Sequence, residues 1–226
     1  MKKLLSIILT VTILIISILS CNAFAAETTK TEALLDKMNT AQEVSVTLRT
    51  GKGQEYGSDY GVTTTVCIKG DKLAFNLYNG FVNMRAVVTE SKIIGFLPSF
   101  PIFCLEADSP FEAENGVWSV IEDLSDITML FLCHVDDYNE TVAGTEYYVE
   151  EFNDREFVTS KFYYIGDELK MLRVEDVSKN TVQYTYFDEI AFEVDDSFFN
   201  TPSFTINITP IMKFFFSSLV GTILPA

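Results

Sequence analysis

The chain has 226 residues, of which 48% are hydrophobic and 13% aromatic, and its formal net charge is −16. This apolar content is enough for a large core and excludes a disordered protein. The surplus of acidic side chains repels phosphate backbones and therefore excludes nucleic acid as a partner. An acidic surface also keeps a protein soluble, so the charge by itself indicates no function.

The N-terminus has the pattern of a secretory signal peptide. Lys2 and Lys3 precede an apolar run over residues 4–19, and Ala23-Phe24-Ala25 provides a small-residue cleavage site. The run is too short to span a membrane comfortably. We therefore predict a signal peptide over residues 1–25, cut after Ala25, and an extracytoplasmic protein. The mature chain keeps 14 of the 16 basic residues and all 32 acidic ones, so its net charge is −18.

A second cleavage pattern overlaps the first. Residues 18–21 read Ile-Leu-Ser-Cys, which matches the motif at which a bacterial lipoprotein is cut and acylated on its cysteine. Acyl chains on Cys21 would hold the protein at a membrane, because each buried methylene contributes about 0.8 kcal/mol. The sequence thus predicts either a secreted protein or one anchored to the outer face of the cell membrane.

The first half of the mature chain predicts one helix and then a meander of strands. Leu34, Met38 and Ala41 recur at helical spacing in residues 28–41, and Thr29 or Thr31 is available as the N-cap. From residue 44 the apolar side chains alternate instead, which is typical of half-buried strands. Asn79-Gly80 is a strong hairpin signal, since both central residues of a type I′ turn need a positive φ. The predicted strands cover residues 44–49, 62–69, 73–77, 81–88, 92–97 and 102–105.

A central helix and a second meander follow. Residues 117–133 predict a helix, with Trp118, Ile121 and Leu124 on one face, and residues 127–135 are apolar all round. His134 would then lie at the end of this helix. Further strands are predicted over residues 145–152, 155–165, 169–175 and 181–190, with turns at Gly166-Asp167 and Lys179-Asn180.

This order of elements resembles the lipoprotein-localisation-factor superfamily, the LolA/LolB-like carriers. The resemblance covers roughly residues 28–205. It is most detailed in the hairpin of residues 162–175 and in the closing run of residues 188–199, with Pro202 after it. It implies an α+β fold: a curled antiparallel sheet, or open half-barrel, with an N-terminal helix and a central helix packed on its concave face. It also implies a lipid or acyl chain as ligand. Arg49, Arg85, Arg155 and Arg173 are the arginines of the chain, and none lies in a motif matching the family's lid arginine.

A concave sheet of this kind would present apolar side chains to a ligand. Large apolar concavities bind acyl chains through contact area. The same side chains would equally serve as ordinary core residues. The predicted cavity residues are Val46, Leu48, Val66, Leu73, Phe75, Leu77, Met84, Val88 and Trp118.

The C-terminal segment, residues 206–226, stands apart as an apolar tail. Residues 211–224 are nearly all apolar but too few to span a bilayer reliably. The tail docks on the domain's own core, fills an apolar groove, or touches a membrane. In the second case the groove-filling residues would be Phe214, Phe215, Phe216 and Leu219.

No catalytic or metal-binding motif is present, so we expect a non-enzymatic protein without a cofactor. His134, the one histidine, lies in the run Cys133-His134-Val135-Asp136-Asp137, a spacing that suits neither a metal site nor a Cys-His dyad. Cys67, Cys104 and Cys133 lie among apolar neighbours and are predicted to be free thiols, with one disulfide among them as the alternative. Two hypotheses remain: a lipid-binding envelope protein, or an interaction module that contacts a membrane-protein partner. The oligomeric state does not follow from the sequence.

Overall fold

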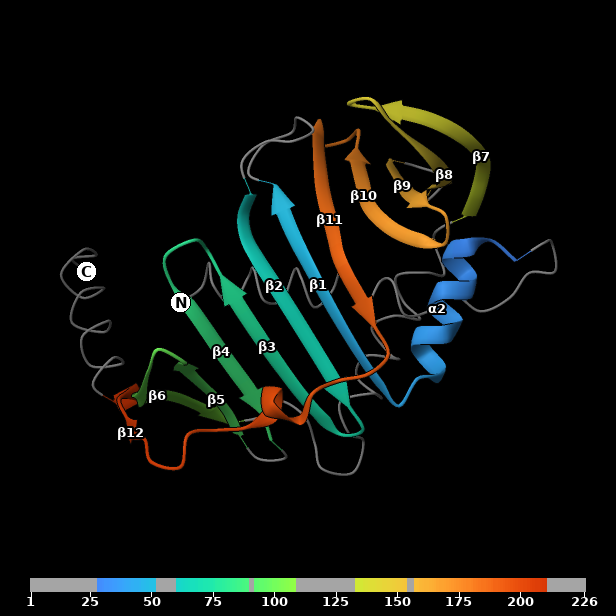
Figure 1. Cartoon of the computed structure of the whole chain (residues 1–226). Helices are drawn as coiled ribbons and strands as arrows, with labels where there is room; N and C mark the ends of the chain where they lie inside the picture. Colours follow the sequence, from blue (N-terminus) through green and yellow to red (C-terminus); the bar gives the residue numbers. More distant parts are fainter. Residues whose placement is uncertain (1–27, 52–59, 90–91, 109–132, 154–156, 211–226) are drawn as a thin grey trace, which may run out of the picture.

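The computed structural model describes residues 28–51, 60–89, 92–108, 133–153 and 157–210 (Figure 1). These residues form one large sheet and one α-helix, α2 (Lys30–Thr40), with a short 3-10 helix, η1 (Asp196–Phe199). The strands are β1 (Glu43–Gly51), β2 (Tyr60–Lys69), β3 (Lys72–Tyr78), β4 (Asn83–Val88), β5 (Lys92–Leu97), β6 (Phe100–Asp108), β7 (Cys133–Val142), β8 (Thr145–Asn153), β9 (Val158–Ile165), β10 (Glu168–Asp176), β11 (Thr181–Ala191) and β12 (Ile206–Asn207).

The sheet is open and almost wholly antiparallel. Its strand order is β12-β6-β5-β4-β3-β2-β1-β11-β10-β9-β8-β7, so β12 and β7 are its two edges. Only the pairing of β12 with β6 is parallel among these strands. Figure 1 shows the sheet strongly twisted and curved, with α2 at the side where β9 and β10 lie. The predicted open antiparallel sheet with an N-terminal helix is therefore confirmed. Of the predicted central helix, residues 117–132 lie outside the described residues.

Helix α2 begins where the sequence predicts, at a capping box. The Thr29 hydroxyl accepts a hydrogen bond from the Glu32 amide, and the Glu32 carboxylate accepts one from the Thr29 amide. A second carboxylate reaches the same helix end from the sheet. Glu150 on β8 accepts hydrogen bonds from the Lys30 and Thr31 amides at 2.6 and 2.7 Å. These contacts satisfy amides that a helix N-terminus leaves without partners, and they join α2 to β8.

The hairpin turns also follow the sequence. At Asn79-Gly80 the Asn79 side chain accepts hydrogen bonds from the Phe81 and Val82 amides, and Gly80 has φ +90°. A side chain at Gly80 would be strained at this φ, which explains the glycine. The predicted turns at Gly166-Asp167 and Lys179-Asn180 likewise connect β9 to β10 and β10 to β11.

One prediction near the middle of the chain is wrong. Cys133 and His134 do not end a helix; they begin β7, the edge strand that pairs with β8. The His134 Nε2 lies 2.8 Å from Asp137 Oδ1, and its ring packs edge-on against Phe152. Because β7 has one neighbour and is mostly exposed, its sequence is acidic and lacks the apolar alternation that identifies buried strands.

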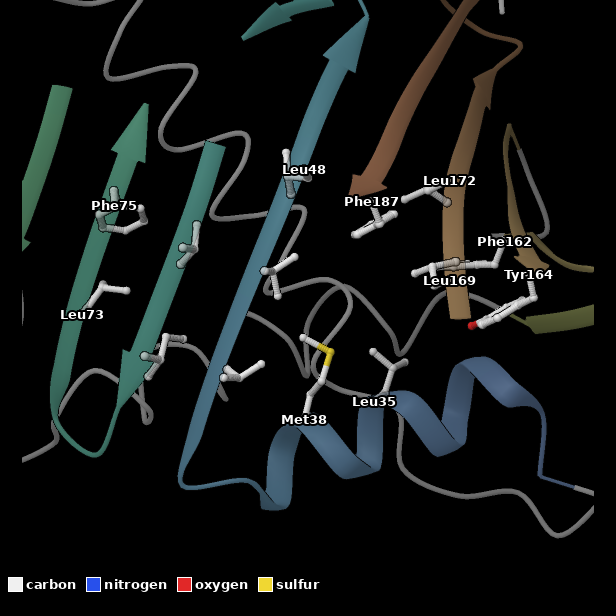
Figure 2. Close-up of a cluster of buried hydrophobic side chains, with 14 of the residues drawn as sticks. Leu35, Met38, Leu48, Leu73, Phe75, Phe162, Tyr164, Leu169, Leu172 and Phe187 are labelled. Carbon is white, nitrogen blue, oxygen red and sulfur yellow. The ribbon is translucent and has the colours of Figure 1, made fainter. Parts of the chain in front are cut away.

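The two faces of the sheet carry separate cores. On one face, Leu35 and Met38 of α2 pack against side chains of β1, β9, β10 and β11 (Figure 2). On the other face, Val194, Phe198 and Phe199 of the segment of residues 192–199 cover Cys67, Val87, Phe96 and Cys104, whereas Phe192 packs on the α2 side. Glu43 and Lys69 fix this segment, since Glu43 accepts from the Val194 amide and Lys69 donates to the Val194 carbonyl.

Candidate functional site

The sequence-predicted cavity residues divide between the core and a second location. Six of them lie in the core cluster that includes Leu35 and Met38: Val46, Leu48, Val66, Leu73, Phe75 and Val88. Leu77 is also buried. Trp118, Cys21 and the tail residues Phe214, Phe215, Phe216 and Leu219 lie outside the described residues. Among the predicted residues that the structure describes, Met84 lines the apolar cavity that follows.

This cavity lies at the β12 side of the sheet, and we call it the edge cavity. Its volume is about 260 Å³. Its lining comes from β4, β5, β6, the turn between β5 and β6, and the residue after β12. The lining residues are Met84, Gly95, Phe96, Leu97, Phe100, Phe103, Cys104, Leu105 and Ile208. None of them carries a charge.

A glycine and a bulge open this space in the sheet. Gly95 pairs with Ala86 on one side and Leu105 on the other, so no side chain projects between them. A Cβ at Gly95 would lie 3.8 Å from the Leu105 carbonyl oxygen and 4.0 Å from that of Arg85, which is ordinary contact. The register then shifts between Phe96 and Leu97, a bulge that turns the end of β5 out of the regular ladder. The edge cavity therefore has room for a side chain where the sequence places none.

The edge cavity has a buried wall and an exposed rim. Phe96 and Cys104 are buried and also belong to the core on the face covered by residues 192–199. In contrast, Phe100 is 51% and Leu105 38% exposed. The rings of Phe100 and Phe103 lie 5.5 Å apart at the rim. An apolar concavity with an open mouth binds a ligand mainly through contact area.

The neighbouring hairpin tip extends the apolar surface. Phe81, directly after Asn79-Gly80, is 96% exposed, and Tyr78 and Val82 beside it are each about half exposed. No charged residue occurs over residues 73–84 or over residues 93–105. In a chain with net charge −16, two such runs on consecutive hairpins indicate a surface that contacts something uncharged.

A polar cavity lies next to the edge cavity along β6. It is lined by Lys92, Glu106, Ala107, Asp108, Asn207, Thr209 and Pro210. The Lys92 ammonium lies 2.7 Å from a Glu106 carboxylate oxygen, and this hydrogen bond lowers the pKa of Glu106. The two cavities thus differ in chemistry while sharing the strand β6 and the segment after β12.

The described residues show no other chemical centre. No group of three or more His, Cys, Asp or Glu residues in the described ranges is arranged to hold a metal ion. Cys67 and Cys104 are buried free thiols, as predicted, whereas Cys133 is only half-buried at the start of β7. Within the same ranges, no helix is both long enough and apolar enough to cross a membrane.

Sequence reasoning missed most of the edge cavity. It did not single out Gly95, Leu97, Phe100, Phe103, Leu105 or Ile208. The strand predicted over residues 102–105 in fact begins at Phe100 and ends at Asp108, so it includes Pro101. The charge-free run of residues 93–105 was the available signal, because its length exceeds that of one buried strand.

Comparison with known proteins gives a likeness of fold alone. No protein-family profile matches the chain, and no curated protein matches its sequence. An uncharacterised conserved protein from Thermus thermophilus has a TM-score of 0.44 at 9% identity, over 79% of this chain and 99% of that one. A DUF1329 family protein from Desulfovibrio piger has a TM-score of 0.32 at 12% identity, over 74% and 93%. A LolA superfamily protein from Nitrosomonas europaea has a TM-score of 0.31 at 13% identity, over 75% and 97%.

Proposed function

We propose that this protein is an extracytoplasmic, non-enzymatic envelope protein that binds an acyl chain or another apolar group in the edge cavity. The observation that carries this proposal is the composition of the cavity. All nine lining residues are uncharged and mostly hydrophobic, and the exposed side chains at its mouth, Phe100 and Leu105 among them, are apolar as well.

The size of the cavity limits the ligand class. About 260 Å³ is just below the range of roughly 300–1,000 Å³ typical of small-molecule sites. A single chain therefore suits it better than a bulky diacyl lipid. Affinity would come from burial, at about 0.8 kcal/mol for each methylene removed from water.

The N-terminal sequence supports the proposed location. A signal peptide with a cut after Ala25 would release the protein, whereas acylation of Cys21 would anchor it to the outer face of the membrane. Both outcomes bring the edge cavity to a compartment where lipids and acylated proteins are available. Native mass spectrometry followed by a denatured run would separate bound lipid from a covalent acyl group.

The direct test fills the cavity from Gly95. Gly95→Phe places a ring in the hollow while its Cβ makes only ordinary contacts, and Gly95→Ala is the matched control that leaves most of the space. Binding of phenylnaphthylamine, a neutral dye, and of lysophosphatidylcholine would be measured on the full chain. We expect Gly95→Phe to lose binding and Gly95→Ala to keep it. Equal binding by both variants would contradict the proposal.

A second candidate function rests on the exposed hairpin tip. Phe81 is 96% exposed at the hairpin tip, within the charge-free run of residues 73–84, which suits contact with an apolar surface of a membrane-protein partner. A photo-crosslinking amino acid at position 81, tested in the host, would capture such a partner. The control carries the same group at Val177, another exposed apolar residue, on the turn between β10 and β11. Identical crosslinked products from the two positions would rule out a specific contact at Phe81.

A further inference from the structure

The chain beyond β12 is fixed along the wall of the edge cavity. Ile206 and Asn207 pair with Phe103 and Cys104 of β6, and the Ile208 amide donates to the Cys104 carbonyl at 3.0 Å. The Thr209 hydroxyl then accepts from the Glu106 amide at 2.7 Å and donates to the Glu106 carbonyl at 3.2 Å. Because Ile208 itself lines the cavity, the segment that follows starts beside the cavity mouth.

The residues that follow are suited to an apolar site. Sixteen residues of the sequence come after Pro210, and Lys213 is the one charged residue among them. Three consecutive phenylalanines, Phe214, Phe215 and Phe216, begin four residues after Pro210. Exposure of three such side chains to water is unfavourable, so they require an apolar surface to cover them.

The tether is short enough to make that surface the edge cavity. Phe214 is six residues from Ile208, and an extended chain spans at most about 3.3–3.6 Å per residue, or roughly 20 Å. A short linker of this kind gives the tethered group an effective concentration in the millimolar range. An apolar ligand free in solution would therefore compete with a segment that is always present.

The polar cavity provides carboxylates close to where the single charged residue of the tail, Lys213, follows in the sequence. It is lined by Glu106 and Asp108 together with Thr209 and Pro210, so it lies where the tail leaves β6. Glu106 already pairs with Lys92. Lys213 is three residues after Pro210, which is close enough along the chain for its ammonium to reach the Asp108 carboxylate.

We propose that residues 211–226 occupy the edge cavity as a resident, displaceable segment, with Phe214, Phe215 and Phe216 against its apolar rim. This inference rests on the proposed function, because it names the competitor that a ligand must displace from the same site. A ligand and the tail then compete for the same cavity, so each lowers the apparent affinity of the other.

The location of the tail is tested by disulfide cross-linking, which needs no ligand. In the full chain, Leu97→Cys is combined with Phe215→Cys, since Leu97 lines the cavity and is accessible. The control pair is Phe157→Cys with Phe215→Cys, because Phe157 is exposed beside β9, far along the sheet order. We expect the 97–215 bond to form about tenfold faster in peptide mass spectra. Equal rates for the two pairs would overturn the proposal.

Competition is tested by replacing the three phenylalanines with serine. The triple variant F214S/F215S/F216S should bind phenylnaphthylamine about tenfold more tightly than the unmodified chain, whereas Phe157→Ser should bind it unchanged. If the 97–215 bond forms but the triple variant binds no dye, the proposed function is wrong and the position of the tail stands. If both proteins bind dye equally and the 97–215 bond is no faster than the control, the tail proposal is overturned and the binding function stands.

Discussion

The two ends of the sheet use the same kinds of side chain for different purposes. In the region packed by α2, Leu35 is 0% exposed and the surrounding side chains of β1 and β9–β11 are buried with it. In the edge region of β4–β6 and β12, leucines and phenylalanines of similar size stay 38–51% exposed around a cavity. Apolar alternation along a strand is therefore common to both regions, and the covering element decides which one becomes core.

The largest expected difference between the two regions is how much a leucine in each contributes to the free energy of unfolding. Leu35→Ala should lower the free energy of unfolding by about 2–5 kcal/mol, because it leaves a hole under α2 that the packed sheet cannot close. Leu105→Ala, the same chemical change at the cavity rim, should cost within about 0.5 kcal/mol, as exposed substitutions do. Urea denaturation followed by circular dichroism measures both. Similar losses from the two variants would show that the edge region is packed as tightly as the core.

Replacing the carboxylate that joins α2 to the sheet should cause the next largest loss in the free energy of unfolding. Glu150 is fully buried, and its two oxygens accept from the Lys30 and Thr31 amides. Glu150→Gln replaces one of these accepting oxygens with an NH₂ group, so a hydrogen-bond donor then faces the N–H of a backbone amide. We expect a loss of about 1.5–3 kcal/mol, the usual contribution of hydrogen bonds to charged groups. Glu146→Gln on the same strand is the control, since Glu146 is exposed. An unfolding free energy equal to that of the control would mean that water replaces the carboxylate.

The smallest effect is expected at a turn outside both regions, and it depends on pH. The Asp176 carboxylate accepts hydrogen bonds from the side chains of Lys179 and Ser178. These bonds, that from Lys179 above all, lower the pKa of Asp176 to about 2. An unfolded aspartate titrates near ~3.9. Because the folded pKa is the lower one, these contacts stabilise the protein above about pH 4 and are lost as the pH falls through about 2.

Asp176→Asn should therefore lower Tm slightly at neutral pH and not at all near the pKa of about 2. Asp71→Asn makes the same change of charge at the turn between β2 and β3, so subtracting its pH profile isolates the contacts with Lys179. A difference in Tm that stays constant from pH 7 to pH 2 would show that Asp176 acts through something other than its charge.

Local signals predicted the sheet and its turns well. The capping residue Thr29 and the spacing of Leu34 and Met38 identified α2. Asn79-Gly80 identified a hairpin, although only Gly80 of the two has the positive φ that a type I′ turn requires at both positions. These signals operate over four to eight residues, which is the range over which backbone preferences act.

The parts that sequence missed depend on distant neighbours. Residues of β7 have one pairing partner, so acidic side chains replaced the apolar alternation and the start of the strand was assigned to a helix. Val46 and Phe75 were predicted either to line a cavity or to serve as ordinary core residues, and they lie in the core cluster of Leu35 and Met38. Alternation placed them on the correct kind of face, but no local pattern states which element packs on that face.

The edge strand β6 has a consequence for the lifetime of the protein. Its exposed Phe100, Ile102 and Phe103 resemble the apolar edges that add further strands, and β12 pairs with only two of its residues. A protease that removed residues 206–209 would leave the backbone of β6 unpaired beside these side chains. C-terminal clipping would then make the β6 edge a template for fibril growth, whereas the acidic, bulged strand β7 at the opposite edge would resist such growth.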